Sequence, residues 1–510
     1  MIQAGSLPWM AQHELRLAWR DLVAMSTGGR RTRGIVLVLF LLAFAAGLHW
    51  LADVLLGRWI AQGIVPDKST LVLVTASGVL FWTVMLSQAM ESVTRAYYAR
   101  SDLDLILSSP ASAQKLFAVR TGAVALTGML LACLLASPII DILALRDGLH
   151  WLSAYAVLAS LAALATALAM LMTIALFRFA GPRRTRLIAQ IIAGVVGAGF
   201  VIGIQAIAIL NLGSLNRFDI LQSADFIAAM PGAESVLWLP ARAAMGSLPE
   251  AALVATLGIG ALALVIATTS GSFAGYAIAA AGVSQTRVSQ APAKPFRRAS
   301  QRQALRLKEW KLLRRDPWLL SQTLMQILYL VPPALFLWVS YGETTGTFVV
   351  VIPVVVMAAG QLAGGLAWLA VSGEDAHDLV VTAPIHPRAV LLAKIEAVLA
   401  VIAVVFGPVL LLLALGSVEL AAATALLVGL SAGASTAIQL WFRVPMRRAM
   451  FRRRQVASRA ATICEALSSI MWAGTAVLAA SGLLVAVVPG AIALIVLFVA
   501  WMPSPRGKRV

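Results

Sequence analysis

Long apolar runs separated by short polar segments recur along the whole chain. Twelve of them reach about 20 residues, the length with which a helix crosses the hydrocarbon core of a bilayer. Because a segment in lipid must satisfy its own backbone hydrogen bonds, each run is predicted to be a transmembrane helix. The predicted spans are 34–56, 69–90, 117–143, 151–178, 187–212, 250–281, 318–340, 345–371, 389–415, 420–440, 460–482 and 485–502.

The last two spans are the hardest to separate, because residues 460–502 form one continuous apolar stretch. Val488-Pro489-Gly490 is the turn-forming sequence within it, and it is predicted to divide the two helices. The first run, Gly34 to Leu56, follows no short apolar region with a cleavage site. It is therefore interpreted as a retained anchor rather than a signal peptide.

The basic residues test this pattern independently, because short cytoplasmic loops of membrane proteins accumulate lysine and arginine. If both termini are cytoplasmic, 35 of the 40 lysines and arginines fall in the predicted inner segments. The predicted outer loops hold Arg58, Lys68, Arg146, Arg217 and Arg242. The sequence therefore predicts twelve spans in a cell inner (plasma) membrane with both ends inside.

Composition agrees with this interpretation. Of 510 residues, 60% are hydrophobic and 12% charged, against about 25% charged in a typical soluble domain. The net charge of +18 comes from loops predicted to face anionic headgroups, so membrane lipid is the expected partner and nucleic acid is not. The sequence has two cysteines, Cys133 and Cys464, and both lie in apolar runs. So few cysteines exclude a disulfide-rich secreted scaffold.

Three short motifs occur in the same order in both halves of the sequence. An even number of spans per half gives both halves the same orientation, which predicts a parallel repeat. The matched positions are Glu14, Leu17, Arg20 and Asp21 with Glu309, Leu312, Arg315 and Asp316; Asp104, Leu105, Pro110 and Arg120 with Asp378, Leu379, Pro384 and Lys394; and Phe179, Pro182 and Arg184 with Phe442, Pro445 and Arg447.

The predicted fold is therefore all-α, with about twelve transmembrane helices in two parallel six-helix repeats. The first half is 1–281, the polar stretch 282–304 is a cytoplasmic linker, and the second half is 305–510. Each half opens with an amphipathic segment, 10–24 and 305–316, of the kind that lies in the headgroup plane.

The loop between the second and third spans of each half carries acidic residues, then leucines, then a proline. Acidic residues favour a helix N-terminus, and the leucines give that helix an apolar surface. The surface packs either on a partner protein or lipid, or beneath the chain's own spans. The candidate partner-coupling residues are Asp102, Leu103, Asp104, Leu105, Leu107 and Pro110, then Glu374, Asp378, Leu379 and Pro384.

This layout resembles the permease subunits of ATP-binding cassette transporters of the ABC-2 exporter type. The likeness lies in the elbow-like helices before each first span, in the motif Asp102–Arg120, in its looser counterpart Asp378–Lys394, and in Leu237–Ser247 before the sixth span. The resemblance implies a translocation pathway between two six-helix halves. It also implies coupling helices that dock on separate cytoplasmic ATP-binding cassette subunits. The second half has no counterpart of loop 213–249 between its last two spans. In this respect the sequence departs from the family, and a symmetric external gate is not expected.

The energy source is not encoded in the sequence. A phosphate-binding loop requires GxxxxGK[ST], and the only Gly-Lys pair, Gly507-Lys508, is followed by arginine. ATP and Mg²⁺ are therefore expected on the partner subunit, with no cofactor and no catalytic residue in this chain.

Ionisable and polar residues within spans are candidates for a transport pathway. They are Asp53 and Asp141 near outer ends, and Gln205, Gln326 and Gln361 within spans. Arg120 and Lys394 are expected to extend to the cytoplasmic interface or to form ion pairs. The five histidines show no metal-ligand spacing, so no metal site is predicted.

Two other functions stay open. An ion-coupled secondary transporter would also have twelve spans, but it predicts acidic residues near the membrane midplane and needs no partner. A membrane enzyme acting on lipid carriers would need a cluster of acid–base or metal-binding residues, and the sequence contains none that is recognisable.

Overall fold

The computed structural model is helical in the part of the chain that it describes. This part comprises residues 6–27, 31–61, 63–98, 112–212, 221–272, 300–315, 346–372, 382–442 and 459–502, with isolated positions between some of these ranges. None of these ranges contains a strand. The all-α prediction is confirmed for them.

Ten segments of the described residues are helical, long and apolar enough to cross a membrane. Each overlaps one predicted span, because an unbroken apolar run both requires a helix and sets its length. The ten are Lys68–Thr94, Gln114–Arg146, Leu149–Phe179, Arg184–Leu210, Leu248–Ser272, Val351–Val371, Pro387–Gly416, Val418–Trp441, Ala461–Ala480 and Leu484–Trp501. These helices are those of a multi-pass membrane protein.

The other two predicted spans differ from these ten. Helix α2 (Arg31–Ala61) covers the predicted span 34–56, and Leu42–Gly57 is the part of its apolar run whose side chains the structure describes without a gap. Predicted span 318–340 is described at only a few positions. The total of twelve therefore stays a prediction.

The division between the last two spans lies at the predicted bounds, 482 and 485, but Val488-Pro489-Gly490 is not the turn that makes it. Helix α20 (Arg459–Ala480) ends before a turn at Gly482, whose φ of +70° favours glycine. Helix α21 (Val487–Trp501) then begins, and Pro489 and Gly490 lie in its first turn. Proline is tolerated there because the first N–H groups of a helix have no intrahelical partner.

The chain divides into two compact units, which are described separately. The first unit comprises Met1–Val201 and Phe218–Ser289, and the second comprises Ile202–Arg217 and Gln290–Val510. The predicted boundaries at 281 and 305 are not tested by this division, and most of the predicted linker 282–304 lies outside the described residues.

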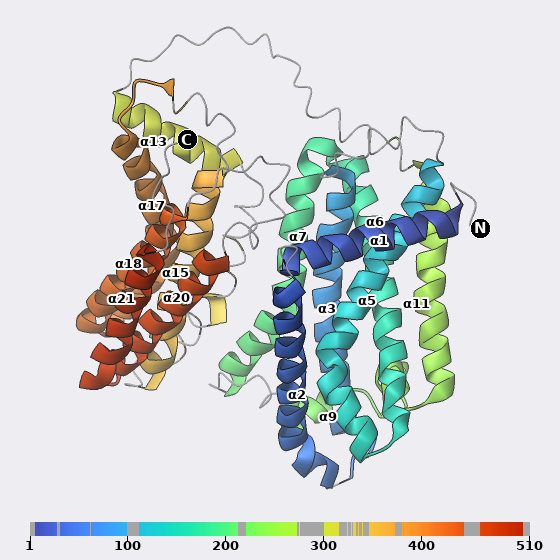
Figure 1. The fold of residues 1–510 in the computed structure, drawn as a ribbon. Helices are drawn as coiled ribbons and strands as arrows, with labels where there is room; N and C mark the ends of the chain where they lie inside the picture. Colours follow the sequence, from blue (N-terminus) through green and yellow to red (C-terminus); the bar gives the residue numbers. More distant parts are fainter. Residues whose placement is uncertain are drawn as a thin grey trace. The chain divides into compact units, whose positions relative to one another are not determined.

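The first unit is organised around α6 (Ser153–Phe179) (Figure 1). Helices α3 (Lys68–Tyr98), α5 (Ala113–Arg146) and α11 (Leu248–Thr269) pack against it, and α2 packs against α5. Alanines and other small residues of α6, including Ala162 and Ala165, let these helices approach closely. Helix α7 (Gly181–Leu212) adds Ala189 and Ala193 to the same core.

The first-unit helix α3 begins at a well-formed cap. The carboxylate of Asp67 accepts hydrogen bonds from the backbone N–H of Thr70 at 2.9 Å and from the Ser69 hydroxyl at 2.7 Å. Burial disfavours the charged carboxylate, but the hydrogen bonds from Thr70 and Ser69 outweigh it and lower the pKa of Asp67.

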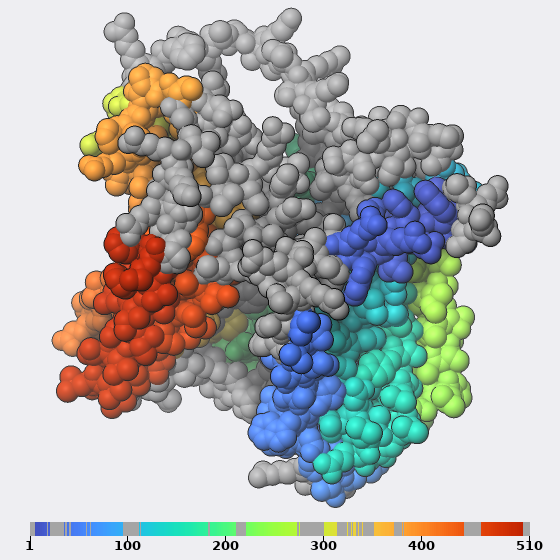
Figure 2. Space-filling model, viewed as in Figure 1, coloured from blue at the N-terminus to red at the C-terminus, as the bar shows by residue number. Residues whose placement is uncertain are grey.

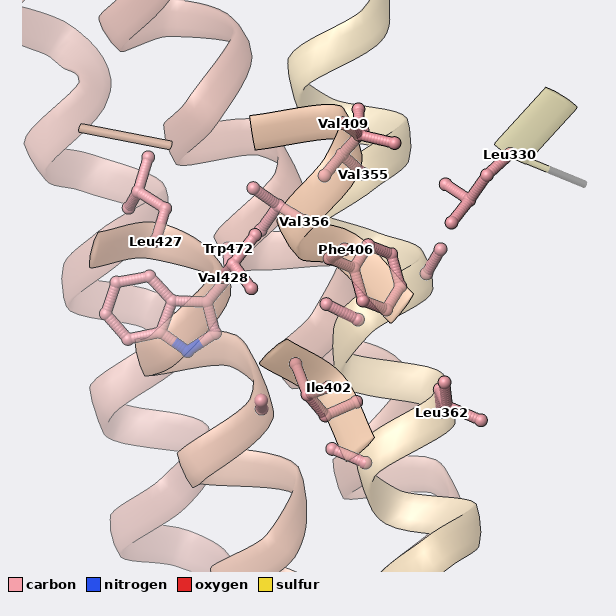
Figure 3. Packing of buried hydrophobic residues seen from close by; sticks show 14 of the residues in the cluster. Leu330, Val355, Val356, Leu362, Ile402, Phe406, Val409, Leu427, Val428 and Trp472 are labelled. Carbon is pink, nitrogen blue, oxygen red and sulfur yellow. The ribbon is translucent and has the colours of Figure 1, made fainter. Parts of the chain in front are cut away.

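The second unit contains α15 (Gly346–Ser372), α17 (Pro387–Gly416) and α18 (Val418–Trp441) together with α20 and α21. Its core includes Phe406, Trp472 and valines of α15 and α18, which lie close together (Figure 3). Pro353 and Pro408 lie inside α15 and α17, which remain helical on both sides of them.

Each unit contains a further helix at the place where the sequence predicted an amphipathic segment. Helix α1 (Leu7–Thr27) packs against α5 and lies across the long helices of the first unit (Figure 1). It forms a strip of that unit's surface on which Leu15 and Trp19 are exposed (Figure 2). Helix α13 (Gln301–Arg315) packs against α17 in the second unit.

The apolar residues of α13 divide between two environments. Leu307 and Trp310 are exposed, as expected of residues that dip into lipid, whereas Leu305 and Leu313 are buried against the unit. This helix is therefore held by packing as well as by its amphipathic surface.

Candidate functional site

The opening helix of the first unit is tied to a transmembrane helix by a buried ion pair. Glu14 of α1 lies 3.4 Å from Arg120 of α5, measured from Oε1 to Nε, and Arg120 is 5% exposed. Arg120 lies seven residues after the first residue of α5, where the helix leaves the loop that carries Asp102–Pro110. The two side chains thus join α1 to the beginning of the predicted third span.

The opening helix of the second unit is tied in the same way. Glu309 of α13 is fully buried, and Lys394 of α17 lies 3.1 Å and 3.3 Å from its two carboxylate oxygens. Lys308 also donates to Glu309, at 3.3 Å. Lys394 in addition donates to the backbone carbonyl of Ala370, two residues before the end of α15.

These contacts form what we call the elbow lock, namely Glu14–Arg120 in the first unit and Glu309–Lys394 in the second. The two acidic residues are a matched pair in the sequence, and so are the two basic ones. A buried charge is costly unless an opposite charge balances it, so each lock fixes its opening helix in one position. Of the two expectations for Arg120 and Lys394, ion pairing is the one observed.

A second, exposed ion pair reinforces the lock in the second unit. Arg306 of α13 donates to both carboxylate oxygens of Glu396 of α17, at 2.5 Å from Nε and 2.9 Å from Nη2. The hydrogen bond with Glu396 raises the pKa of Arg306. Both side chains are about half exposed, so this pair orients α13 more than it stabilises the fold.

The second loop, residues 373–386, connects α15 to α17. Lys394 of the second lock contacts the helix on each side of this loop. Ala370 lies near the end of α15, and Lys394 lies in the third turn of α17. The predicted coupling residues Asp102, Leu103, Asp104, Leu105, Leu107 and Pro110, and also Glu374, Asp378 and Leu379, lie outside the described residues. Pro384 is described and exposed, just before α17 begins.

The predicted pathway residues that the structure describes lie on four helices, α2, α5, α7 and α15. Asp53 forms an ion pair with Arg146 at 2.8 Å, and Asp141 accepts hydrogen bonds in the first unit. Gln205 is half-buried in α7, Gln361 is exposed on α15, and Gln326 lies outside the described residues.

A polar seam in the second unit was not predicted as a site. Glu465 of α20 is 7% exposed and accepts a hydrogen bond from Gln439 of α18, and one turn along, the hydroxyls of Ser435 and Ser469 lie 3.4 Å apart. Gly364 of α15 lies against the Glu465 carboxylate, where a Cβ atom would clash. The sequence does carry a signal for this seam. Ser435 and Gln439 are four residues apart, and so are Glu465 and Ser469, so each pair lies on one face of its helix.

The segment Leu237–Ser247 is folded against the first unit. It begins within a short turn of helix, Val236–Trp238, and continues into α10 (Leu239–Ala244). Trp238 is buried and donates to the carbonyl of Gly232 at 2.9 Å. Arg242 pairs with Glu250 of α11 at 2.8 Å, which fixes this segment to the helix that follows it.

The described residues contain no group of three or more histidine, cysteine, aspartate or glutamate side chains placed to hold a metal ion. In comparisons with protein-family models, with curated proteins and with solved structures, none matched this chain.

Proposed function

We propose that this chain is the membrane-spanning subunit of an ATP-driven exporter of the ABC-2 type. The observation that carries the proposal is the elbow lock, which occurs at matched sequence positions in both units. In each unit it joins an amphipathic opening helix to the helix that follows the acidic, leucine-rich loop. The choice of family rests on the resemblance described for the sequence. The elbow lock would let the motifs of that family transmit force between helices.

The proposed mechanism begins at the two loops. Each loop would dock on a cytoplasmic ATP-binding cassette subunit, with Leu105 and Leu379 as apolar contacts. Because Lys394 contacts both α13 and the end of α15, a force applied to loop 373–386 would move α13, α15 and α17 together. Arg120 and Glu14 would transmit force from the first loop to α1.

The proposal includes two parallel six-helix halves with both termini in the cytoplasm, in a cell inner membrane. The distribution of lysine and arginine supports this orientation. The substrate would pass between the halves, and ATP and Mg²⁺ would bind to the partner subunits, because the chain has no phosphate-binding loop. In this proposal the chain is a transport subunit and has no enzymatic activity of its own.

Affinity purification of the tagged chain from its native membranes tests the proposal. A second polypeptide with a phosphate-binding loop should co-purify, and Leu105→Asp with Leu379→Asp should release it, because each variant places a charge on an apolar contact. Val236→Asp, at an exposed position outside the candidate spans, would serve as a control that keeps the partner. Purification of the chain alone, with its transport activity intact, would contradict the proposal.

An ion-coupled secondary transporter is the second candidate function. The buried Glu465, hydrogen-bonded to Gln439, favours it, since such carriers place carboxylates inside their helix bundles. Uptake driven by an imposed ion gradient in vesicles that contain this chain alone would support this candidate over the exporter.

A further inference from the structure

Helices α1 and α13 carry matched sequence motifs, but they differ in charge. With His13 neutral, α1 has two basic and two acidic residues and therefore no net charge. Helix α13 has six basic residues and one acidic residue, a net charge of +5. When Glu14 is aligned with Glu309, Arg16 falls opposite Lys311, so this basic position is common to both helices. The additional basic residues of α13, whose counterparts in α1 are uncharged, are Arg302, Arg306, Lys308 and Arg314.

Carboxylates close to α13 balance only part of this charge. In the part of the chain that the structure describes, two carboxylates contact the cations of α13, and each of them faces two cations. Glu309 is fully buried and pairs with two ammonium groups, one from α13 and one from α17. Glu396 of α17 pairs with Arg306 and also lies near Arg302, one turn earlier on α13. Because one carboxylate offsets one positive charge, the surface around α13 stays positive.

One face of α13 combines two apolar side chains with a cation. Lys311 follows Leu307 by four residues and Trp310 follows it by three, so the three side chains share a face of the helix. All three are exposed, whereas Leu305 and Leu313 on the opposite side are buried against the unit. Lys311 forms no ion pair with any residue that the structure describes. This arrangement is typical of amphipathic helices that hold apolar side chains in lipid and cations among the headgroups.

The contacts of α13 place this face at the end of a membrane span. Its partners Lys394 and Glu396 lie in the third turn of α17, whose apolar span begins at Pro387. Phospholipid headgroups lie at the ends of spans, so the exposed face of α13 is at headgroup level. Clusters of about four to eight basic residues on an amphipathic helix are typical of binding to anionic lipids, and α13 has six. The exposed Leu307 and Trp310 favour a lipid over an acidic protein segment, because acyl chains supply the apolar surroundings that they need.

We propose that the exposed face of α13 binds anionic phospholipids. Lys311 pairs with the lipid phosphate, Leu307 and Trp310 lie among the acyl chains, and the unbalanced charge around Arg302 attracts further anionic headgroups. Helix α1 has no net charge, so it binds the membrane surface without a comparable preference for headgroup charge. The anionic lipid content of the membrane therefore acts on the opening helix of the second unit and not on that of the first.

Site-specific fluorescence quenching tests this surface in the full chain reconstituted in lipid nanodiscs. A fluorophore on Ala304→Cys, an exposed position of α13, reports the lipids beside that helix, with Cys133→Ala and Cys464→Ala removing the native thiols. The quenchers are phosphatidylglycerol and phosphatidylcholine that carry the same nitroxide on an acyl chain, at equal mole fraction. We expect phosphatidylglycerol to quench about threefold more than phosphatidylcholine at about 0.05 M salt. The two lipids should become equal at about 1 M salt, where the Debye length is about 3 Å.

Lys311→Gln combined with Arg302→Gln should bring the quenching ratio of the two lipids close to one, because it removes two positive charges from α13. Neither residue belongs to the elbow lock, so this variant should stay folded, which its unfolding temperature checks. Lys311→Arg combined with Arg302→Lys keeps both charges and should keep the ratio.

Arg16→Gln is the matched control, since Arg16 aligns with Lys311 and is exposed on α1. It should leave the ratio at Ala304→Cys unchanged. A fluorophore on Gln12→Cys, an exposed position of α1, should show a ratio at least twofold lower than the fluorophore on α13.

The inference is overturned if the two lipids quench Ala304→Cys equally at low salt, or if the paired glutamine substitutions keep the ratio. It is also overturned if Gln12→Cys gives the same ratio as Ala304→Cys, because the preference would then belong to the basic loops in general. None of these measurements involves the proposed ATPase partner, so the exporter proposal and this surface can fail separately.

Discussion

Glu309 is a carboxylate with no exposed surface in a chain where most charges lie in loops. Its charge is balanced by Lys394 of another helix and by Lys308 of its own. In a buried ion pair, the loss of one member costs more than the pair itself contributes, because the remaining charge stays buried without its balance. The elbow lock therefore behaves as a unit.

Lys394→Met tests this directly. Removing the ammonium leaves Glu309 buried with Lys308 as its remaining ion-pair partner among the described residues, and losses of about 3–5 kcal/mol are typical of such changes. Unfolding of the second unit, followed by heat or denaturant in nanodiscs, should show a loss of this order.

Arg306→Gln provides the control for that measurement on the same pair of helices. Its partner Glu396 is half exposed, so solvent screens the charge that is left behind, and the loss should be much smaller. Equal losses in the two variants would show that burial of the Glu309–Lys394 pair has no special importance.

The candidate residues were predictable from the sequence only where a motif repeats. Glu14 and Glu309, and Arg120 and Lys394, were matched by position, and the structure pairs each acid with its base. The buried Glu465 lies against Gly364 of another helix, and no local sequence pattern shows that contact.

The helices themselves were largely predictable, because an apolar run of about 20 residues in lipid has few alternatives to a helix. The bounds 482 and 485 also placed the break between α20 and α21 correctly, but the turn sequence expected to cause it was wrong. Val488-Pro489-Gly490 has turn-forming residues, but the chain reverses at Gly482, where a positive φ is required, and proline is accepted in the first turn of α21. Gly482 and Val488-Pro489-Gly490 are both turn-forming sequences in one apolar run, and composition alone does not show at which of them the chain turns.

Close contact between α6 and α11 depends on a single glycine. A Cβ atom at Gly258 would lie 2.5 Å from the backbone carbonyl oxygen of Ser160 and 2.9 Å from its Cα. Because that neighbour is backbone rather than a flexible side chain, Gly258→Ala should force the helices apart. Overpacking of this kind costs about 1–3 kcal/mol, measurable as a lower unfolding temperature.

Gly260→Ala, two residues along α11, is the matched control. No atom lies within 4 Å of a Cβ atom at this position, so alanine should leave stability unchanged or raise it through its higher helix propensity. If both variants destabilise the protein equally, close packing at Gly258 is not the cause.

At the scale of the whole molecule, two compact units each contain a helix, α1 or α13, that is joined to a long apolar helix by a buried ion pair. Sequence patterns predicted the helical class and the opening helices. They did not predict which acid meets which base, since those contacts join residues 106 and 85 positions apart in the chain. Such contacts depend on tertiary packing.

The central claim is that the two loops pass force from a separate ATPase to helices joined by the elbow locks. ATP hydrolysis by the complex purified through this chain, in lipid nanodiscs, tests it most directly. We predict hydrolysis that vanishes when the lysine of the partner's phosphate-binding loop is replaced and that falls at least tenfold in Leu105→Asp with Leu379→Asp. Hydrolysis that is the same with and without the two loop substitutions, or a functional chain that purifies without any ATPase, would contradict the account.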